Sequence, residues 1–293
     1  NIEFDHADIY RDAEAYRWAF SRFINLVPRS GALVAGWDSA VVRALAPASF
    51  APVESFSCDD GADGPGADHP RWHATDLEFG EDRTRFRVLC GGEEWGVADS
   101  PLPGLFNVQN ALAAIAAAAA IGGARDAILD GLATFRSVRR RMEVRGTVAG
   151  VTVIDDFAHH PTAVRETIRA ARQRYPGRRL VAVFEPRSYT AQRREFQADY
   201  EAALGSADEV VIAGLFHPER YTRETGIDPD GMVETWRASG LTAHHIPDPD
   251  RIAERLGDSA GPGDVVLIMS NGGFGGLHGK LLERLGQRAV AEG

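Results

Sequence analysis

Two acids and two imidazoles lie close together in the stretch VTVIDDFAHHPTAV, residues 151–164. These four residues are Asp155, Asp156, His159 and His160. An apolar run at 151–154 precedes them, and Pro161 favours the first turn of a helix, where its missing N–H needs no partner. Carboxylates and imidazoles hold hydroxyl groups, bind metal ions or transfer protons. The alternative is that the aspartates cap turns and one histidine is a satisfied buried group.

Polar residues follow other apolar runs in the same way. The segment VAVFEPRSYTAQR places Glu185, Arg187 and Ser188 after one run, and the forked guanidinium of Arg187 suits a carboxylate or a phosphate. His217 follows another run, where an exposed loop histidine is the simpler interpretation. The glycine-rich SNGGFGG turn is not a Walker loop, because the single lysine of the chain, Lys280, stands in the wrong context.

The pattern of elements predicts an α/β protein with two domains. In the second half, apolar runs alternate with helical patterns, which indicates a parallel, doubly wound sheet with ligands at the carboxyl ends of its strands. The predicted strands are 151–154, 180–184, 209–214 and 264–269, and the predicted helices are 161–174, 191–204, 230–239 and 277–291. The first half predicts helices at 12–26, 107–121 and 124–135, a strand at 31–37 and a hairpin over 73–97. The sequence pattern changes at the arginine-rich segment RSVRRRMEVRG, which predicts two domains, 1–138 and 139–293.

Composition excludes several classes of protein. The 293 residues carry a formal net charge of -10, which argues against a general partner of nucleic acid or of membrane surfaces. Two cysteines fit neither a disulfide framework nor a zinc site, so we expect a cytoplasmic location. Neither a signal peptide nor an apolar run of about 18 residues is visible.

A set of short motifs resembles the Mur ligases, the ATP-dependent amide-forming enzymes of peptidoglycan synthesis. The motifs are NIEFDHADIY at the start, NVQNALAAIAAA, RRRMEVRG, DDFAHHPTAV, FEPRS and SNGGFGG. The resemblance covers essentially the whole chain and implies the end of the central ATPase domain followed by a Rossmann-like C-terminal domain. It also implies that the sequence is a fragment, inactive alone, whose UDP-sugar domain and Walker loop precede Asn1.

The resemblance assigns roles to individual residues, with ATP and Mg²⁺ as cofactors. It implies magnesium binding by the histidine of the first motif, adenine contacts from two asparagines, and nucleotide contacts from an arginine and an aspartate that holds the ribose. It places a histidine, an arginine and a serine against the incoming amino substrate. In that order, these residues are His6, Asn107, Asn110, Arg141, Asp156, His159, Arg187 and Ser188.

Within the family, the motifs are most similar to the branch that joins UDP-N-acetylmuramate to the tripeptide L-Ala-γ-D-Glu-meso-diaminopimelate during peptidoglycan recycling. The alternative inside the family is the L-alanine-adding ligase. From other classes, a metal-dependent phosphoesterase built on the Asp-Asp…His-His cluster and a non-catalytic nucleotide-binding module remain open.

Overall fold

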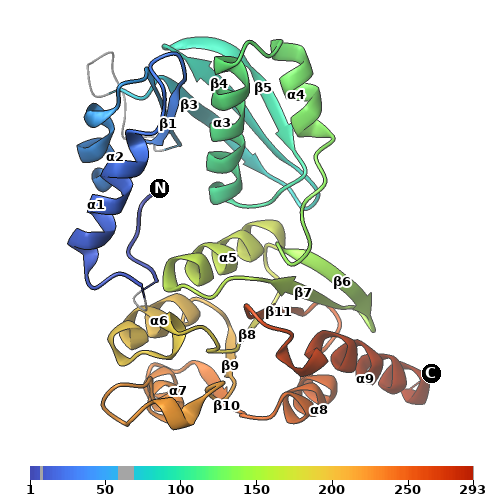
Figure 1. The fold of residues 1–293 in the computed structure, drawn as a ribbon. Helices are drawn as coiled ribbons and strands as arrows, with labels where there is room; N and C mark the ends of the chain where they lie inside the picture. Colours follow the sequence, from blue (N-terminus) through green and yellow to red (C-terminus); the bar gives the residue numbers. More distant parts are fainter. Residues whose placement is uncertain (7–8, 59–68, 293) are drawn as a thin grey trace. The chain divides into compact units, whose positions relative to one another are not determined.

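The computed structural model describes residues 1–6, 9–58 and 69–292 of the chain. They form two compact units, Asn1–Ser137 and Val138–Gly293 (Figure 1). The division falls one residue before the boundary predicted from the sequence. Each unit is a sheet covered by helices, so the predicted α/β class is confirmed.

The first unit contains a five-stranded mixed sheet. Its strands lie in chain order, the first three parallel and the last three antiparallel. They are β1 (Leu33–Gly36), β2 (Val53–Ser57), β3 (Trp72–Phe79), β4 (Thr84–Cys90) and β5 (Glu93–Ser100). The predicted hairpin over 73–97 was incomplete, because Gly91 and Gly92 make a second turn that starts β5. Both glycines have positive φ values, 61° and 86°, as a tight hairpin turn requires.

Helix α3 (Leu105–Ala120) covers this sheet with an apolar face. Val108, Ala111, Leu112 and Ile115 are buried in the core of the unit, at the spacing of one helical stripe. The other helices of the unit are α1 (Ala13–Ile24), α2 (Ala40–Leu45) and α4 (Arg125–Ala133). The helices predicted at 12–26, 107–121 and 124–135 therefore correspond to α1, α3 and α4.

The second unit contains a six-stranded sheet of the doubly wound type. Its order is β10-β9-β8-β11-β7-β6, and only β6, at one edge, runs antiparallel. The strands are β6 (Glu143–Val148), β7 (Val151–Asp156), β8 (Leu180–Phe184), β9 (Glu209–Ile212), β10 (Thr242–His245) and β11 (Val265–Met269). The four predicted strands are the four buried ones; the two missed strands are the edges, which lack a continuous apolar run.

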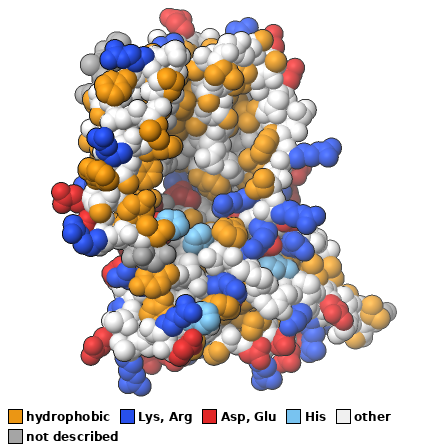
Figure 2. Space-filling view, viewed as in Figure 1, with side chains coloured by type: hydrophobic (Ala, Val, Ile, Leu, Met, Phe, Trp, Pro, Cys, Tyr) orange, Lys and Arg blue, Asp and Glu red, His pale blue; other side chains and the backbone are white. Residues whose placement is uncertain are grey.

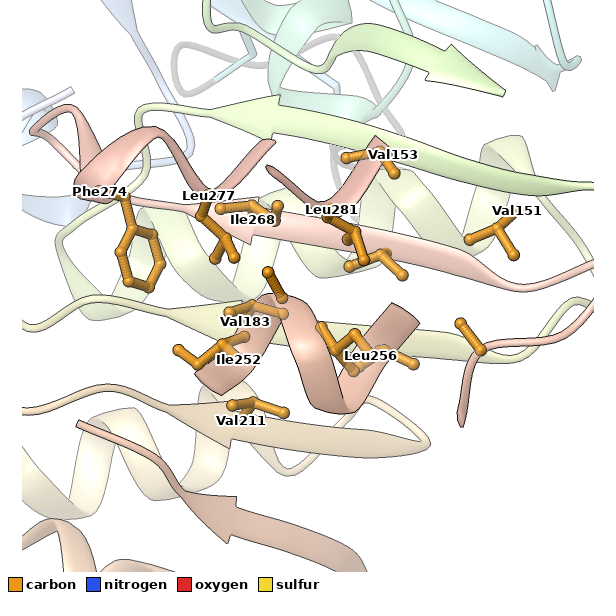
Figure 3. Packing of buried hydrophobic residues seen from close by; sticks show 14 of the residues in the cluster. Val151, Val153, Val183, Val211, Ile252, Leu256, Ile268, Phe274, Leu277 and Leu281 are labelled. Carbon is orange, nitrogen blue, oxygen red and sulfur yellow. The ribbon is translucent and has the colours of Figure 1, made fainter. Parts of the chain in front are cut away.

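Helices cover both faces of this sheet. Helices α5 (Pro161–Arg174), α6 (Gln197–Leu204) and α7 (Pro229–Ala238) lie on one face, and α8 (Pro249–Ser259) and α9 (Leu277–Glu292) lie on the other (Figure 1). In Figure 3, Val153 of β7 and Ile268 of β11 pack against Leu281 of α9, while Val183 of β8 lies beside Ile252 of α8. This apolar layer holds the strands, and therefore their carboxyl ends, in place against α8 and α9.

The helix predicted over 191–204 begins later, at Gln197. Arg193 is extended, with φ −88° and ψ 137°, and only short 3-10 turns lie on either side of it. Two backbone hydrogen bonds explain the difference: Arg194 N donates to Thr225 O, and Ile227 N donates to Gln192 O. This pairing with a distant loop competes with helical hydrogen bonding, and it depends on tertiary contacts that a local pattern does not contain.

The described part of the chain has no helix long and apolar enough to span a bilayer. Basic and acidic side chains are interspersed over the face drawn in Figure 2.

Candidate functional site

The last two residues of β7 point to opposite faces of the sheet. Val151 and Val153 belong to the core beneath α8 and α9, so the two-residue period of a strand sends Asp155 to that face. The same period sends Asp156 to the face covered by α5. Both aspartates are almost fully buried, with 3% of Asp155 and 2% of Asp156 exposed. The two carboxylates therefore have separate surroundings and separate roles.

The Asp156 carboxylate is occupied by hydrogen bonds from the protein itself. Its Oδ2 accepts from Met142 N at 2.8 Å, and its Oδ1 accepts from Ala158 N at 2.8 Å and Thr167 Oγ1 at 3.4 Å. Burial raises the pKa of Asp156 above its ordinary value, against the opposing pull of the two amides. The ribose role stays a prediction, and it would require these bonds to be shared or broken.

The Asp155 carboxylate faces a histidine and two arginines. His278 Nε2 lies 3.2 Å and Arg140 Nε 3.4 Å from its Oδ1, and Arg145 Nη1 lies 3.9 Å from its Oδ2. Burial alone would raise the pKa of Asp155, but His278 and Arg140 outweigh it and hold that pKa below the ordinary 3.8. Asp155 is therefore an anionic anchor for α9 and for the segment that precedes β6.

Arg140 joins three parts of the unit, although no sequence pattern singled it out. Its side chain contacts Asp155, and its Nη2 donates to the carbonyls of Ser270 and Gly272, the latter at 2.7 Å. Its backbone has φ 61°, which is uncommon for a residue other than glycine, and its N–H donates to Glu143 Oε2 at 2.8 Å. Arg140 thus fastens the start of the unit to the loop after β11.

Arg141, which the resemblance assigned to the nucleotide, points to solvent, unlike Arg140. Its side chain is exposed, and its guanidinium lies 5.6 Å from the ring centroid of Phe157. The ring of Phe157 also faces Arg140, at 5.0 Å. Residues 139–141 are all arginines, and the direction of each side chain decides which one is buried. The sequence of the run does not predict that direction.

A second polar contact links the ends of β8 and β11. Ser270 Oγ donates to Glu185 Oε2 and accepts from Gly272 N at 2.8 Å. Glu185 and Ser270 are both buried. Because Ser270 and Gly272 also contact Arg140 through their carbonyls, the start of the glycine-rich loop is held from two sides.

The two predicted acceptor residues after β8 have different surroundings. The Arg187 guanidinium lies 3.6 Å from the ring centroid of Phe216, and its Nη1 lies 3.7 Å from Glu185 Oε1. Ser188 Oγ accepts a hydrogen bond from Ala191 N at 3.0 Å and so caps the following 3-10 turn. A substrate contact by Ser188 stays a prediction.

The two histidines of the corner are held apart. His159 Nδ1 lies 2.9 Å from Phe157 O, and its own carbonyl accepts from Tyr200 OH at 2.5 Å. His160 is the N-cap residue of α5, and its ring stacks edge-on against Phe196. Among the described residues, no group of three or more His, Cys, Asp or Glu side chains is placed to hold a metal ion. The phosphoesterase alternative therefore lacks its metal cluster in the described part of the chain.

His6 lies in the first unit, exposed and with φ 55°. Its Nε2 lies 4.0 Å from Asp5 Oδ2, and residues 7 and 8 are outside the described ranges. Magnesium prefers an octahedral set dominated by oxygen ligands. The imidazole of His6 and the carboxylate of Asp5 do not fit that requirement as they stand, so magnesium binding by His6 stays a prediction.

The predicted adenine residues lie together in the first turns of α3. Asn107 Nδ2 donates to Pro103 O at 2.8 Å, and Asn110 Nδ2 lies 3.5 Å from Asn107 Oδ1. Gly104, with φ 90°, is the N-cap residue of the helix. Asn110 is exposed and presents an amide to solvent.

Lys280 lies in the first turn of α9. Its Nζ contacts Asp250 of α8, and both residues line a surface groove between these two helices. The glycine-rich turn before α9 instead buries Phe274, which packs into the core in Figure 3. The lysine is thus paired with an acidic side chain of α8, and the glycine-rich turn is anchored by its buried phenylalanine.

Fold and site together define an α/β protein with polar groups gathered at the carboxyl ends of a doubly wound sheet. Two family models match it: the Mur ligase middle domain over residues 1–118, and the Mur ligase, glutamate ligase domain over residues 140–272. The chain belongs to the Mur ligase family.

Individual relatives agree with this assignment. The chain is 37% identical to the UDP-N-acetylmuramate–L-alanyl-γ-D-glutamyl-meso-2,6-diaminoheptandioate ligase of Escherichia coli strain K12, covering 99% of this chain and 59% of the relative. It is 35% identical to the UDP-N-acetylmuramate–L-alanine ligase of Salinibacter ruber, covering 93% and 55%. The crystal structure of a murein peptide ligase from Psychrobacter arcticus 273-4 is 28% identical with a TM-score of 0.65, covering 98% and 56%. The chain thus spans less than two thirds of the length of these relatives.

Asp156→Ala is predicted to destabilise the second unit. The change leaves the amides of Met142 and Ala158 and the hydroxyl of Thr167 without their buried acceptor, which costs about 1–3 kcal/mol or more in unfolding free energy. Equilibrium urea unfolding measures the loss, with Asp258→Ala, at an exposed surface ion pair, as the control. Unchanged stability combined with weakened ATP binding would instead support the ribose role.

Asp155→Asn is predicted to make the unfolding free energy depend less steeply on pH under acidic conditions. Because the folded protein holds the pKa of Asp155 below 3.8, the carboxylate stabilises the fold above that pH, and this contribution is lost as the pH falls through the lower folded value. The raised pKa of Asp156 acts with the opposite sign. Unfolding free energies from about pH 6 to about pH 3 should fall more steeply in the wild type than in the variant. If unfolding free energy fell equally steeply with pH in both proteins, the stabilising role of the Asp155 carboxylate would be contradicted.

Proposed function

We propose that the chain forms the middle and C-terminal parts of an ATP-dependent ligase that joins UDP-N-acetylmuramate to L-Ala-γ-D-Glu-meso-diaminopimelate in peptidoglycan recycling. Membership of the Mur ligase family supports the reaction class, and the E. coli relative supports this acceptor. The observation that carries the proposal is the Arg187 guanidinium at the end of β8, a cation of the right geometry for a carboxylate of the acceptor.

The proposed reaction has two steps. The muramate carboxylate takes the γ-phosphoryl group of ATP, which gives an acyl phosphate and ADP. The peptide amine then attacks the acyl carbon, a C–N bond forms, the C–O bond to phosphate breaks, and the nitrogen loses a proton. The chain must therefore hold a nucleotide, bind the acceptor and receive that proton.

His159 is proposed as the group that faces the amine. Since a carbonyl oxygen only accepts, the contact between His159 Nδ1 and Phe157 O places the proton of the neutral imidazole on Nδ1. The lone pair then lies on Nε2, which is the atom that takes up the amine proton. The same hydrogen bond fixes the direction of the ring.

The nucleotide is proposed to contact Asn107, Asn110 and Arg141. Both asparagines offer amide groups at the start of α3, and the exposed Arg141 offers a cation free to meet phosphate. Magnesium is proposed to accompany ATP and to neutralise phosphate charge. No step is assigned to magnesium here, because His6 and Asp5 do not fit a magnesium site as they stand.

The second candidate is UDP-N-acetylmuramate–L-alanine ligase. The Salinibacter ruber relative with this name is nearly as similar to the chain as the E. coli relative, at 35% against 37% identity. The two candidates differ in the acceptor, because the tripeptide carries carboxylates far from its attacking amine and free alanine does not. Acceptor preference therefore decides between them.

Arg187→Ala is predicted to impair use of the tripeptide while leaving ATP use nearly unchanged. Loss of a charge-assisted, two-pronged hydrogen bond costs roughly 1.5–3 kcal/mol, which raises the KM for the tripeptide about ten- to a hundredfold. Arg187→Lys should recover only part of this loss, because lysine keeps the charge and loses the fork. The measurement is steady-state kinetics at saturating ATP. The assay uses the full-length protein that contains these 293 residues.

The control is Arg169→Ala, at an exposed arginine of α5. The wild type should show a higher kcat/KM with the tripeptide than with L-alanine. A higher kcat/KM with free alanine would select the second candidate. Unaltered tripeptide kinetics in Arg187→Ala would remove Arg187 from the site.

A further inference from the structure

The Arg187 side chain lies between an aromatic ring and a glycine. On one side its Cζ is 3.6 Å from the ring centroid of Phe216. On the other side is Gly272, where an added Cβ would come within 2.3 Å of Arg187 Cδ and Nε and 2.5 Å of Cζ. Only a residue without a side chain at position 272 leaves the guanidinium this space.

Hydrogen bonds hold every part of this stack in place. Gln192, 3% exposed, donates through Nε2 to the carbonyls of Arg187 and Ser188 and accepts through Oε1 from His217 N. One buried amide therefore ties the loop that carries the arginine to the loop that carries Phe216. Gly272 is fixed by the Arg140 and Ser270 contacts described above.

Stacking immobilises the guanidinium but leaves its hydrogen-bonding edge available. The Arg187 N–H groups donate no hydrogen bond to a residue in the described ranges, and Glu185 Oε1, at 3.7 Å, is beyond hydrogen-bonding distance. Planar N–H donors that are already oriented lose little side-chain entropy when they bind a carboxylate. The nearby Glu185 lowers the net charge of the site, which favours a singly charged carboxylate over a phosphate dianion.

We propose that Phe216 and Gly272 are positioning residues that make Arg187 a preformed receptor for a carboxylate of the acceptor peptide. This inference rests on the proposed function and deepens it. It names a residue on the loop after β9, outside every motif that the sequence singled out, as a determinant of acceptor affinity. Phe216 acts by stacking on the face of the guanidinium, and Gly272 acts by leaving room for it.

Two pairs of variants test the proposal in the full-length protein that contains these residues. Phe216→Leu keeps apolar bulk and removes the ring, whereas Phe216→Tyr keeps the ring. Gly272→Ala adds a methyl group where the guanidinium lies, whereas Gly273→Ala adds one where nothing lies within 4 Å. Steady-state kinetics with L-Ala-γ-D-Glu-meso-diaminopimelate and with ATP, plus the unfolding midpoint of each variant, form the readout.

Phe216→Leu should raise the KM for the tripeptide about three- to fivefold, because the cation–π contact is partly exposed to solvent, with kcat and the KM for ATP nearly unchanged. Gly272→Ala should raise the tripeptide KM at least as much. Phe216→Tyr and Gly273→Ala should stay within about twofold of the wild type.

The outcomes separate this inference from the proposed function. If Arg187→Ala raises the tripeptide KM but Phe216→Leu and Gly272→Ala match their controls, the positioning role is overturned and the acceptor site stands. If Arg187→Ala itself has no effect, both fail. Equal rises in the KM for ATP and for the tripeptide in Phe216→Leu would also overturn the role, because they would indicate a general structural effect.

Discussion

The candidate site depends on the way β7 ends, in two adjacent carboxylates that the strand period sends to opposite faces of the sheet. Asp156 holds the corner before α5 through backbone amides, and Asp155 holds Arg140 and His278 on the other face. If the pairing register of β7 shifted by one residue, the two charges would exchange faces and neither set of contacts would form. The polar corner is therefore first a structural junction, and its binding groups are arranged around it.

Arg140 extends this junction across the sheet. Its φ of 61°, and that of Met142 at 50°, are unfavourable for residues with side chains, and both backbones are held by carboxylates, Glu143 and Asp156 respectively. From this fixed position the Arg140 side chain reaches the carbonyls of Ser270 and Gly272. Contacts at the start of the unit thus shape the loop against which Arg187 lies, although Arg140 itself is not placed to touch the acceptor in our proposal.

The sequence predicted those parts of the molecule that local patterns determine. Buried parallel strands give continuous apolar runs, so β7, β8, β9 and β11 were found, and their shared carboxyl ends drew attention to Asp155, Glu185 and Arg187. Edge strands such as β10 lack that signal, and the late start of α6 depends on pairing with the loop at Gly226. The family followed from the motifs and their order rather than from periodicity.

Side-chain direction was the part that the sequence did not contain. The ribose role of Asp156 stays a prediction, although its oxygens accept from the protein's own amides. Nothing in the run of arginines showed that Arg140 is the one whose side chain turns inward. Phe216 carried no signal at all, because its role arises only where the loop after β9 meets the loop after β8. Such contacts join residues far apart in the chain, and a single sequence gives no measure of them.

The most direct test of the account is a crystal structure of the protein, with any flanking sequence, bound to the tripeptide and a non-hydrolysable ATP analogue. We predict that the Arg187 guanidinium, still stacked on Phe216, donates two hydrogen bonds to a peptide carboxylate. A complex in which Arg187 leaves Phe216 and contacts no peptide carboxylate would contradict this account.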